Sequence, residues 1–131
     1  MISDCCNTVP EARNAVGRPV LQQRGSDLEW NTDNCKALFL NPNPVSLLTT
    51  AADLGQKASS NNQFGGFFSY FFKTAMENHF ARFVKNVTWD GVMQETTKET
   101  IFKANHTYCD KPYTDENICK QNPFYKMVFG R

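Results

Sequence analysis

Short apolar runs separated by polar stretches predict the strands of this chain. The run VSLLTTAA, at residues 45–52, is bounded by turn residues and predicts a buried strand, and the polar, glycine-containing stretch 53–66 predicts a surface loop. The tail FYKMVF, at residues 124–129, follows an Asn-Pro turn and is rich in strand-forming residues, so it predicts a last short strand. The opening MISDCC has the pattern of a strand end.

Two helices are predicted between these strands. Apolar side chains recur at steps of four residues from residue 66 to residue 85, which predicts an amphipathic helix. The apolar stripe of this helix comprises Phe67, Phe68, Phe71, Phe72, Ala75, Met76, Phe80, Phe83 and Val84. Thr88 is a residue type that caps helix N-termini, so a second helix is predicted from Trp89 to about Asn105. The polar stretch 11–44 predicts a long connection with one short helix near residues 11–16.

Length and charge limit the classes of partner. A chain of 131 residues is the size of one ordinary domain. Its 14 Lys and Arg balance 13 Asp and Glu, so no net field attracts nucleic acid or an anionic membrane surface. A run of about 18 apolar residues, which a membrane-spanning helix requires, does not occur. We therefore expect neither a nucleic-acid partner nor a membrane span.

The five cysteines leave at least one thiol without an intrachain partner. The plausible local disulfide joins Cys109 to Cys119 and would close the polar loop CDKPYTDENIC, but free thiols at both positions remain an alternative. A Cys-x-x-Cys pair or a histidine pair at ligand spacing is lacking, so no metal and no cofactor is expected.

A cysteine at the end of the first strand is the candidate for chemistry. Open α/β sheets hold their ligands beyond the carboxyl ends of the strands. A thiol needs a base to become a nucleophile, and histidine is the usual one. His79 lies in the Phe-rich helix and is expected to pack or face solvent, and His106 lies at a helix end, where the helix dipole explains it. Neither is expected to act as the base.

The stretch ISDCCNT resembles the nucleophile motif of caspase-like cysteine peptidases of the metacaspase and bacterial type, which runs Asp-x-Cys-His-Ser-Gly at the end of a central strand. Asp4 and Cys6 match the aspartate and the cysteine, whereas Asn7 and Thr8 stand where histidine and serine are common. Three later segments are similar to the family in the same order: VSLLTTAADLGQKASSNNQFGGFFSYFF, TWDGVMQE and QNPFYKMVF.

This resemblance implies a partial caspase-like (caspase–hemoglobinase) α/β fold, with a mostly parallel sheet and flanking helices. Residues 1–131 would be the C-terminal portion of one such domain. Within it, residues 1–8 would form the nucleophile strand and turn, 9–44 a connecting loop, and 45–131 a region similar to the small subunit. The catalytic histidine would come from a His-Gly motif on an upstream, large-subunit-like partner chain.

The resemblance also implies a set of site residues. Cys6 would be the catalytic nucleophile, and Asp4, assisted by Asp53, would pair with a Lys or Arg of a peptide or protein substrate. The backbone of Ala58 and Ser59 would pair with the substrate as an added strand. The implied function is therefore a cysteine-type endopeptidase portion that prefers Lys or Arg and has little or no activity as an isolated chain.

Two other functions stay open. The chain can be a non-catalytic caspase-like fragment or pseudoenzyme that acts as an interaction module, because the Cys-His-Ser-Gly pattern and a base are missing. It can also be a small disulfide-stapled secreted domain, although one bridge between Cys109 and Cys119 would not stabilise a chain of this length alone.

Overall fold

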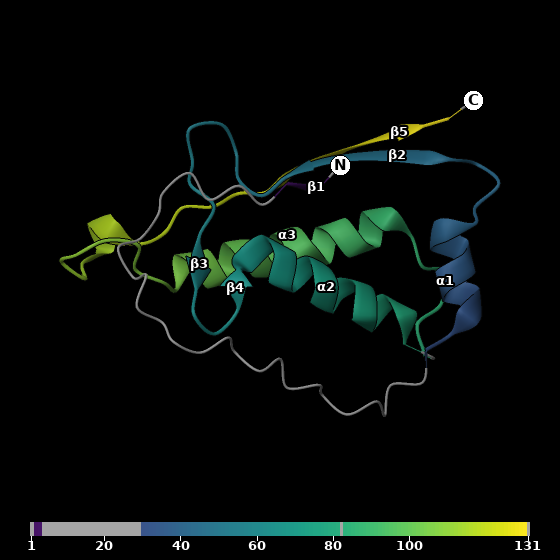
Figure 1. The fold of residues 1–131 in the computed structure, drawn as a ribbon, viewed down its shortest axis with the longest axis horizontal. Helices are drawn as coiled ribbons and strands as arrows, with labels where there is room; N and C mark the ends of the chain where they lie inside the picture. The colour runs from purple at the N-terminus through teal and green to yellow at the C-terminus, as the bar shows by residue number, and fades with distance from the viewer. Residues whose placement is uncertain (1, 4–29, 82, 131) are drawn as a thin grey trace.

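The structure is a computed structural model that describes residues 2–3, 30–81 and 83–130 (Figure 1). One sheet contains β1 (Ile2–Ser3), β2 (Val45–Thr50) and β5 (Phe124–Phe129), in the order β1-β2-β5. A second sheet pairs β3 (Ser60–Asn61) with β4 (Gly65–Gly66). The helices are α1 (Thr32–Phe39), α2 (Phe67–Phe80) and α3 (Trp89–Asn105), followed by a 3-10 turn at Asp115–Asn117.

The prediction of a mostly parallel sheet is wrong. The long pairing is antiparallel and joins β2 to β5 from Val45↔Phe129 to Thr50↔Phe124, and β3 and β4 are also antiparallel. The parallel pairing of β1 with β2 covers only Ile2↔Thr49 and Ser3↔Thr50. The reason is the path between β2 and β5: α2 runs against β2, α3 runs against α2, and β5 runs against α3, so after three reversals β5 is antiparallel to β2 (Figure 1). A parallel neighbour would need a crossover with one helix, in which the chain reverses only twice.

Helices cover one face of the β1-β2-β5 sheet (Figure 1). On this face Leu47 and Tyr125 pack against a core cluster of Ala51, Ala58, Phe68 and Met93. Because strand side chains alternate between the two faces, the neighbouring positions point away from the helices. On that outer face the side chains of Leu48 and Val128 are 57% and 53% exposed.

Helix α2 forms where the stripe of phenylalanines predicts a helix, but it ends at Phe80 and not near residue 85. The side chains of Phe67, Phe68, Ala75 and Phe80 are buried, as predicted. Phe83 was expected on the same stripe, yet its side chain is 90% exposed because it lies beyond the end of the helix. The helical periodicity of the sequence therefore continues past the point where the helix stops.

Helix α1 lies inside the stretch 9–44 that was predicted to be a connecting loop. Asn31 caps its N-terminus by accepting a hydrogen bond from the backbone N–H of Asp33 at 2.9 Å. Leu38 is buried, and its backbone carbonyl accepts a hydrogen bond from the indole N–H of Trp89 at 3.0 Å. The short helix expected near residues 11–16 lies outside the described residues.

The predicted second helix and the two strands β2 and β5 are confirmed. Helix α3 begins at Trp89, and the hydroxyl of Thr88 accepts a hydrogen bond from the backbone N–H of Gly91 at 3.1 Å. Its side chains Val92 and Met93 are fully buried. None of the helices that the structure describes is both long and apolar enough to cross a membrane.

Candidate functional site

A hollow of about 440 Å³ lies at the carboxyl end of β2. The segment that follows the strand forms most of its wall, and the first residue of β5 completes it. The lining residues are Thr50, Ala51, Ala52, Asp53, Leu54, Gly55, Gln56, Ala58 and Phe124. A volume of this size falls within the range of ligand-binding pockets.

The hollow is next to the end of β1. Ser3, the last residue of β1, pairs with Thr50, which is the last residue of β2 and lines the hollow. Because the two strands are parallel, the chain leaves both of them at the same edge of the sheet. Asp4 and Cys6 follow Ser3 in the sequence but lie outside the described residues.

Asp53 is the one ionisable residue among the described residues that line the hollow. Its side chain is exposed, and one carboxylate oxygen accepts a hydrogen bond from the backbone N–H of Leu54 at 2.8 Å. The backbone N–H of Gln56 donates to the carbonyl of Asp53 at 3.0 Å and closes a turn. Gly55 occupies this turn with a φ of +80°, a conformation that favours glycine.

Ala58 and Ser59 are buried at the far end of the same segment, 8% and 6% exposed. The backbone N–H of Ser59 donates to the side-chain oxygen of Gln121 at 2.9 Å. The Ser59 carbonyl accepts a hydrogen bond from the backbone N–H of Phe67 at 3.0 Å, at the start of α2. Both backbone groups of Ser59 are therefore engaged within the chain, whereas Ala58 lines the hollow.

Gln121 is a site-forming residue that the sequence did not single out. Its side chain is 1% exposed, and its amide group bonds to Ser59 as above and donates to the backbone carbonyl of Ala51 at 2.8 Å. The sequence signal for this role is weak, since a glutamine before an Asn-Pro turn has no distinguishing pattern. The long-range contacts of Gln121 with residues 51 and 59 become visible only in the folded chain.

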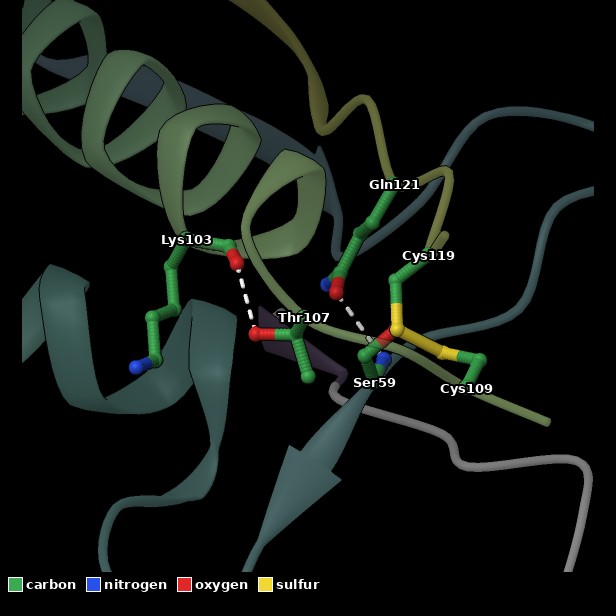
Figure 2. The surroundings of a disulfide bond; sticks show 6 residues. All are labelled: Ser59, Lys103, Thr107, Cys109, Cys119 and Gln121. Atoms are coloured by element: carbon green, nitrogen blue, oxygen red, sulfur yellow. Dashed lines mark hydrogen bonds between the residues drawn. A yellow bond between two sulfur atoms is a disulfide. The ribbon is translucent and has the colours of Figure 1, made fainter. Parts of the chain in front are cut away.

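The disulfide between Cys109 and Cys119, which the sequence left open, is formed in the structure (Figure 2). Cys119 is 2% exposed, and its backbone N–H donates to the Thr107 carbonyl at 2.8 Å. The sulfur of Cys109 lies 3.4 Å from the hydroxyl oxygen of Ser59. Figure 2 shows the disulfide, Ser59 and Gln121 gathered at the end of α3.

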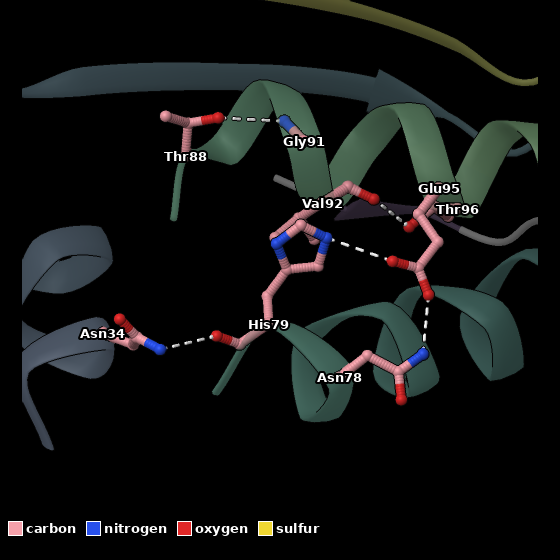
Figure 3. A network of polar contacts seen from close by, with 8 residues as sticks. All are labelled: Asn34, Asn78, His79, Thr88, Gly91, Val92, Glu95 and Thr96. Carbon is pink, nitrogen blue, oxygen red and sulfur yellow. Dashed lines mark hydrogen bonds and ion pairs between the residues drawn. The ribbon is translucent and has the colours of Figure 1, made fainter. Parts of the chain in front are cut away.

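His79 lies away from the hollow, in the last turn of α2 beside α1. Its Nε2 is 3.1 Å from a carboxylate oxygen of Glu95 on α3, and Asn78 donates to the other oxygen of Glu95 at 2.6 Å (Figure 3). Its Nδ1 is buried and has no hydrogen-bond partner among the residues that the structure describes. His106 has its Nδ1 2.7 Å from the carbonyl of Phe102. Both histidines thus have interhelical or helix-end contacts and neither lines the hollow.

The hollow contains no arrangement typical of a metal centre. Among the described residues, no group of three or more His, Cys, Asp or Glu side chains is close enough to hold a metal ion. The described residues that line the hollow are therefore uncharged apart from Asp53, which supplies one carboxylate.

No protein-family model, no curated protein and no solved structure matches this chain.

Proposed function

We propose that this chain is the C-terminal portion of a cysteine-type endopeptidase in which Cys6 is the nucleophile. The proposal starts from the resemblance of ISDCCNT to the nucleophile motif of caspase-like peptidases. The observation that carries it further is the parallel pairing of Ser3 with Thr50, because it puts the start of the ISDCCNT segment beside a hollow.

Chain connectivity limits how far Cys6 can be from this hollow. Cys6 is three positions beyond Ser3, the described end of β1, and three residues of fully extended chain span at most about 11 Å. Thr50, on the neighbouring strand and about 5 Å from Ser3, already lines the hollow. A cysteine at position 6 can therefore serve a substrate bound there.

The charge of the hollow favours a basic substrate residue. Asp53 contributes a carboxylate to its wall, and no Lys or Arg is among the described lining residues. A lysine or arginine side chain of a peptide would gain a charge-assisted hydrogen bond there, whereas an acidic side chain would meet a like charge. Asp4 directly follows Ser3 in the sequence and is proposed as the second carboxylate of the site.

The reaction is acyl transfer through a thioester. The Cys6 thiol gives its proton to a histidine, and the thiolate attacks the peptide carbonyl carbon. The carbon–nitrogen bond breaks, the histidine returns the proton to the leaving amine, and water then hydrolyses the thioester and regenerates the thiol. Since His79 and His106 do not line the hollow, we propose that the histidine is supplied by an upstream, large-subunit-like chain.

The uncovered face of the sheet supports a partner of this kind. Leu48 and Val128 expose apolar side chains on the face that no described helix covers (Figure 1). Strand β1 is at the edge of the sheet order β1-β2-β5, so among the described residues it pairs on one side only. A second chain could add a strand beside β1 and cover this face.

The test is to mix the chain with an upstream chain that carries a His-Gly strand and to measure cleavage of peptides that contain Lys or Arg. We expect cleavage by the pair, its loss in Cys6→Ala, and its retention in Cys5→Ala, which is the matched control. Replacing Lys by Glu in the peptide should reduce the rate at least tenfold. If the complete pair cleaves none of these peptides, the peptidase proposal is wrong.

The exposed apolar face also favours a second candidate, a non-catalytic interaction module. Alkylation with iodoacetamide near neutral pH separates the two. A catalytic Cys6 reacts faster than Cys35, which is half-buried and packs against the core cluster around Leu38 and Phe80. Equal, slow labelling of both thiols would support the interaction module.

A further inference from the structure

A single buried amide holds both ends of the segment that forms the hollow. The side-chain NH₂ of Gln121 donates to the Ala51 carbonyl at 2.8 Å, and its oxygen accepts from the Ser59 N–H at 2.9 Å. Ala51 directly follows β2, and Ser59 directly precedes β3. The segment between them supplies most of the lining residues of the hollow.

The segment that carries Gln121 is itself anchored. Two residues earlier, Cys119 is buried and bonded to Cys109, whose sulfur contacts the hydroxyl of Ser59 (Figure 2). One residue later, the backbone N–H of Asn122 donates to the side-chain oxygen of Gln56 at 2.7 Å. Gln121 therefore bonds to the start and the end of the segment around the hollow, and the backbone of its neighbour Asn122 bonds to the middle of this segment.

The donor and the acceptor of the Gln121 amide match the two backbone groups at the ends of the segment. One end of the segment presents a carbonyl, which needs a donor, and the other presents an N–H, which needs an acceptor. Among side chains of this length, only glutamine offers both groups from one planar unit at neutral pH, where a glutamate is ionised. Leaving either backbone group unpaired in a buried position would cost free energy and loosen that end of the segment.

We propose that Gln121 is a positioning residue that sets the shape of the substrate pocket by holding Ala51 and Ser59 at a fixed separation. This inference deepens the proposed peptidase function and rests on it for the identity of the substrate. Gln121 is not among the residues that line the hollow, and the oxygen and the nitrogen of its amide each bond to a backbone group. Its effect is on the pocket that holds the basic side chain of the substrate.

The direct test is amide hydrogen exchange of Ser59, measured by NMR in the chain as it exists. Gln121→Met keeps the length of the side chain and removes both hydrogen bonds. We expect the protection factor of the Ser59 amide to fall at least about tenfold in this variant. The matched control, Gln63→Met, changes an exposed glutamine in the turn between β3 and β4 and should leave the Ser59 amide as in the unmodified chain.

A second variant keeps the inference testable if Gln121→Met does not fold. Gln121→Glu introduces a carboxyl that, when protonated, offers one donor and one acceptor at the same positions. The Ser59 N–H keeps an acceptor in both protonation states, whereas the Ala51 carbonyl loses its donor as this carboxyl ionises, so the urea midpoint of this variant should fall as the pH rises while the Ser59 amide stays protected. No such fall is expected in the unmodified chain.

Activity of the pair with the upstream chain gives the functional readout. For a Lys-containing peptide, Gln121→Met should raise KM about tenfold and change kcat less than about threefold, and Gln121→Glu at low pH should restore KM. Unchanged Ser59 exchange in Gln121→Met, or an equal loss in kcat and kcat/KM, overturns the positioning role. Absence of cleavage by the unmodified pair overturns the peptidase proposal instead, and the exchange result still decides whether Gln121 holds the segment.

Discussion

At the scale of single residues, one buried amide bonds to carbonyls at the end of α2 and just beyond it. The side-chain nitrogen of Asn34 lies 3.1 Å from the His79 carbonyl, 3.3 Å from that of Ala81 and 3.0 Å from that of Val84. Carbonyls at the end of a helix have no partner within the helix, so an amide from α1 can satisfy them. Figure 3 shows Asn34 reaching the last turn of α2 from α1.

We predict that Asn34→Ala lowers the free energy of unfolding by about 2 kcal/mol, because it takes the side-chain donor from the partly buried carbonyls of His79 and Val84. Urea denaturation followed by circular dichroism measures this change. Asn62→Ala, at an exposed turn position, is the control and should change stability by less than about 0.5 kcal/mol. An equal effect of the two substitutions would show that the Asn34 contacts do not matter.

The ionisation of Tyr125 gives a prediction of how the free energy of unfolding depends on pH. Burial raises the pKa of its phenol above the ordinary 10.0, and the hydrogen bond to the Asp90 carboxylate and the charge of that carboxylate raise this pKa further. A raised pKa in the folded state means that the stabilisation is fully present below pH 10.0 and is lost as the pH rises through the pKa of the folded state.

Tyr125→Phe should therefore lower stability at pH 7 by about 1 kcal/mol and make the free energy of unfolding less sensitive to pH above 10. Denaturation curves at a series of pH values up to 11 test this. The control is Tyr113→Phe, whose ring is exposed and which should keep the stability at pH 7. A steeper alkaline loss in Tyr125→Phe would contradict the assignment.

At the scale of elements, α3 contributes many of the buried side chains of the fold. It contacts α2 along most of its length, and its side chains Val92, Met93, Thr96, Thr100 and Ala104 are buried. Two of these are threonines, whose hydroxyls donate to the carbonyls four residues earlier at 2.7 Å. A polar residue can thus be buried in the core when its hydroxyl bonds to the backbone of its own helix.

The start of α3 depends on the hydroxyl of Thr88. We expect Thr88→Ala to reduce the free energy of unfolding by about 1 kcal/mol, because the N–H of Gly91 loses its acceptor. Thr88→Ser keeps the oxygen and should retain most of the stability. Thermal unfolding of both variants provides the measurement, and a serine variant as unstable as the alanine variant would rule out capping as the cause.

At the scale of the whole molecule, the described elements form two layers, with the helices on one side of the sheet (Figure 1). The outer face carries Leu48, Phe124 and Val128, each more than half exposed. Apolar side chains grouped on one face of a sheet commonly mark a contact surface. This face and the edge of β1 are where we propose that the upstream chain binds.

Leu48→Thr combined with Val128→Thr should weaken binding of the upstream chain about tenfold while changing the stability of the isolated chain by less than about 0.5 kcal/mol. Isothermal titration calorimetry measures the binding. Leu47→Thr, one position along β2 on the helix side, is the control for stability and should reduce it by about 2 kcal/mol. Unchanged binding in the double variant would place the partner elsewhere.

Much of the local structure could be predicted from the sequence. The strands β2 and β5, the helix α3 and its Thr88 cap follow patterns of neighbouring residues, and all are confirmed. Of the predicted site residues, Asp53 and Ala58 line one hollow, the backbone groups of Ser59 bond within the chain, and Asp4 and Cys6 lie outside the described residues. Gln121 could not be predicted, because its role depends on contacts with residues more than 60 positions away.

By itself the sequence determined that β2, β5, α2 and α3 form, because hydrophobic periodicity, capping hydroxyls and Asn-Pro turns act between residues a few positions apart. Only the tertiary structure decided the direction of β5, the end of α2 at Phe80, the presence of α1 and the closure of the Cys109–Cys119 disulfide. Each of these depends on which distant segments meet. Contacts between distant segments depend on burial and hydrogen bonding across the whole chain. A pattern of neighbouring residues does not predict these contacts.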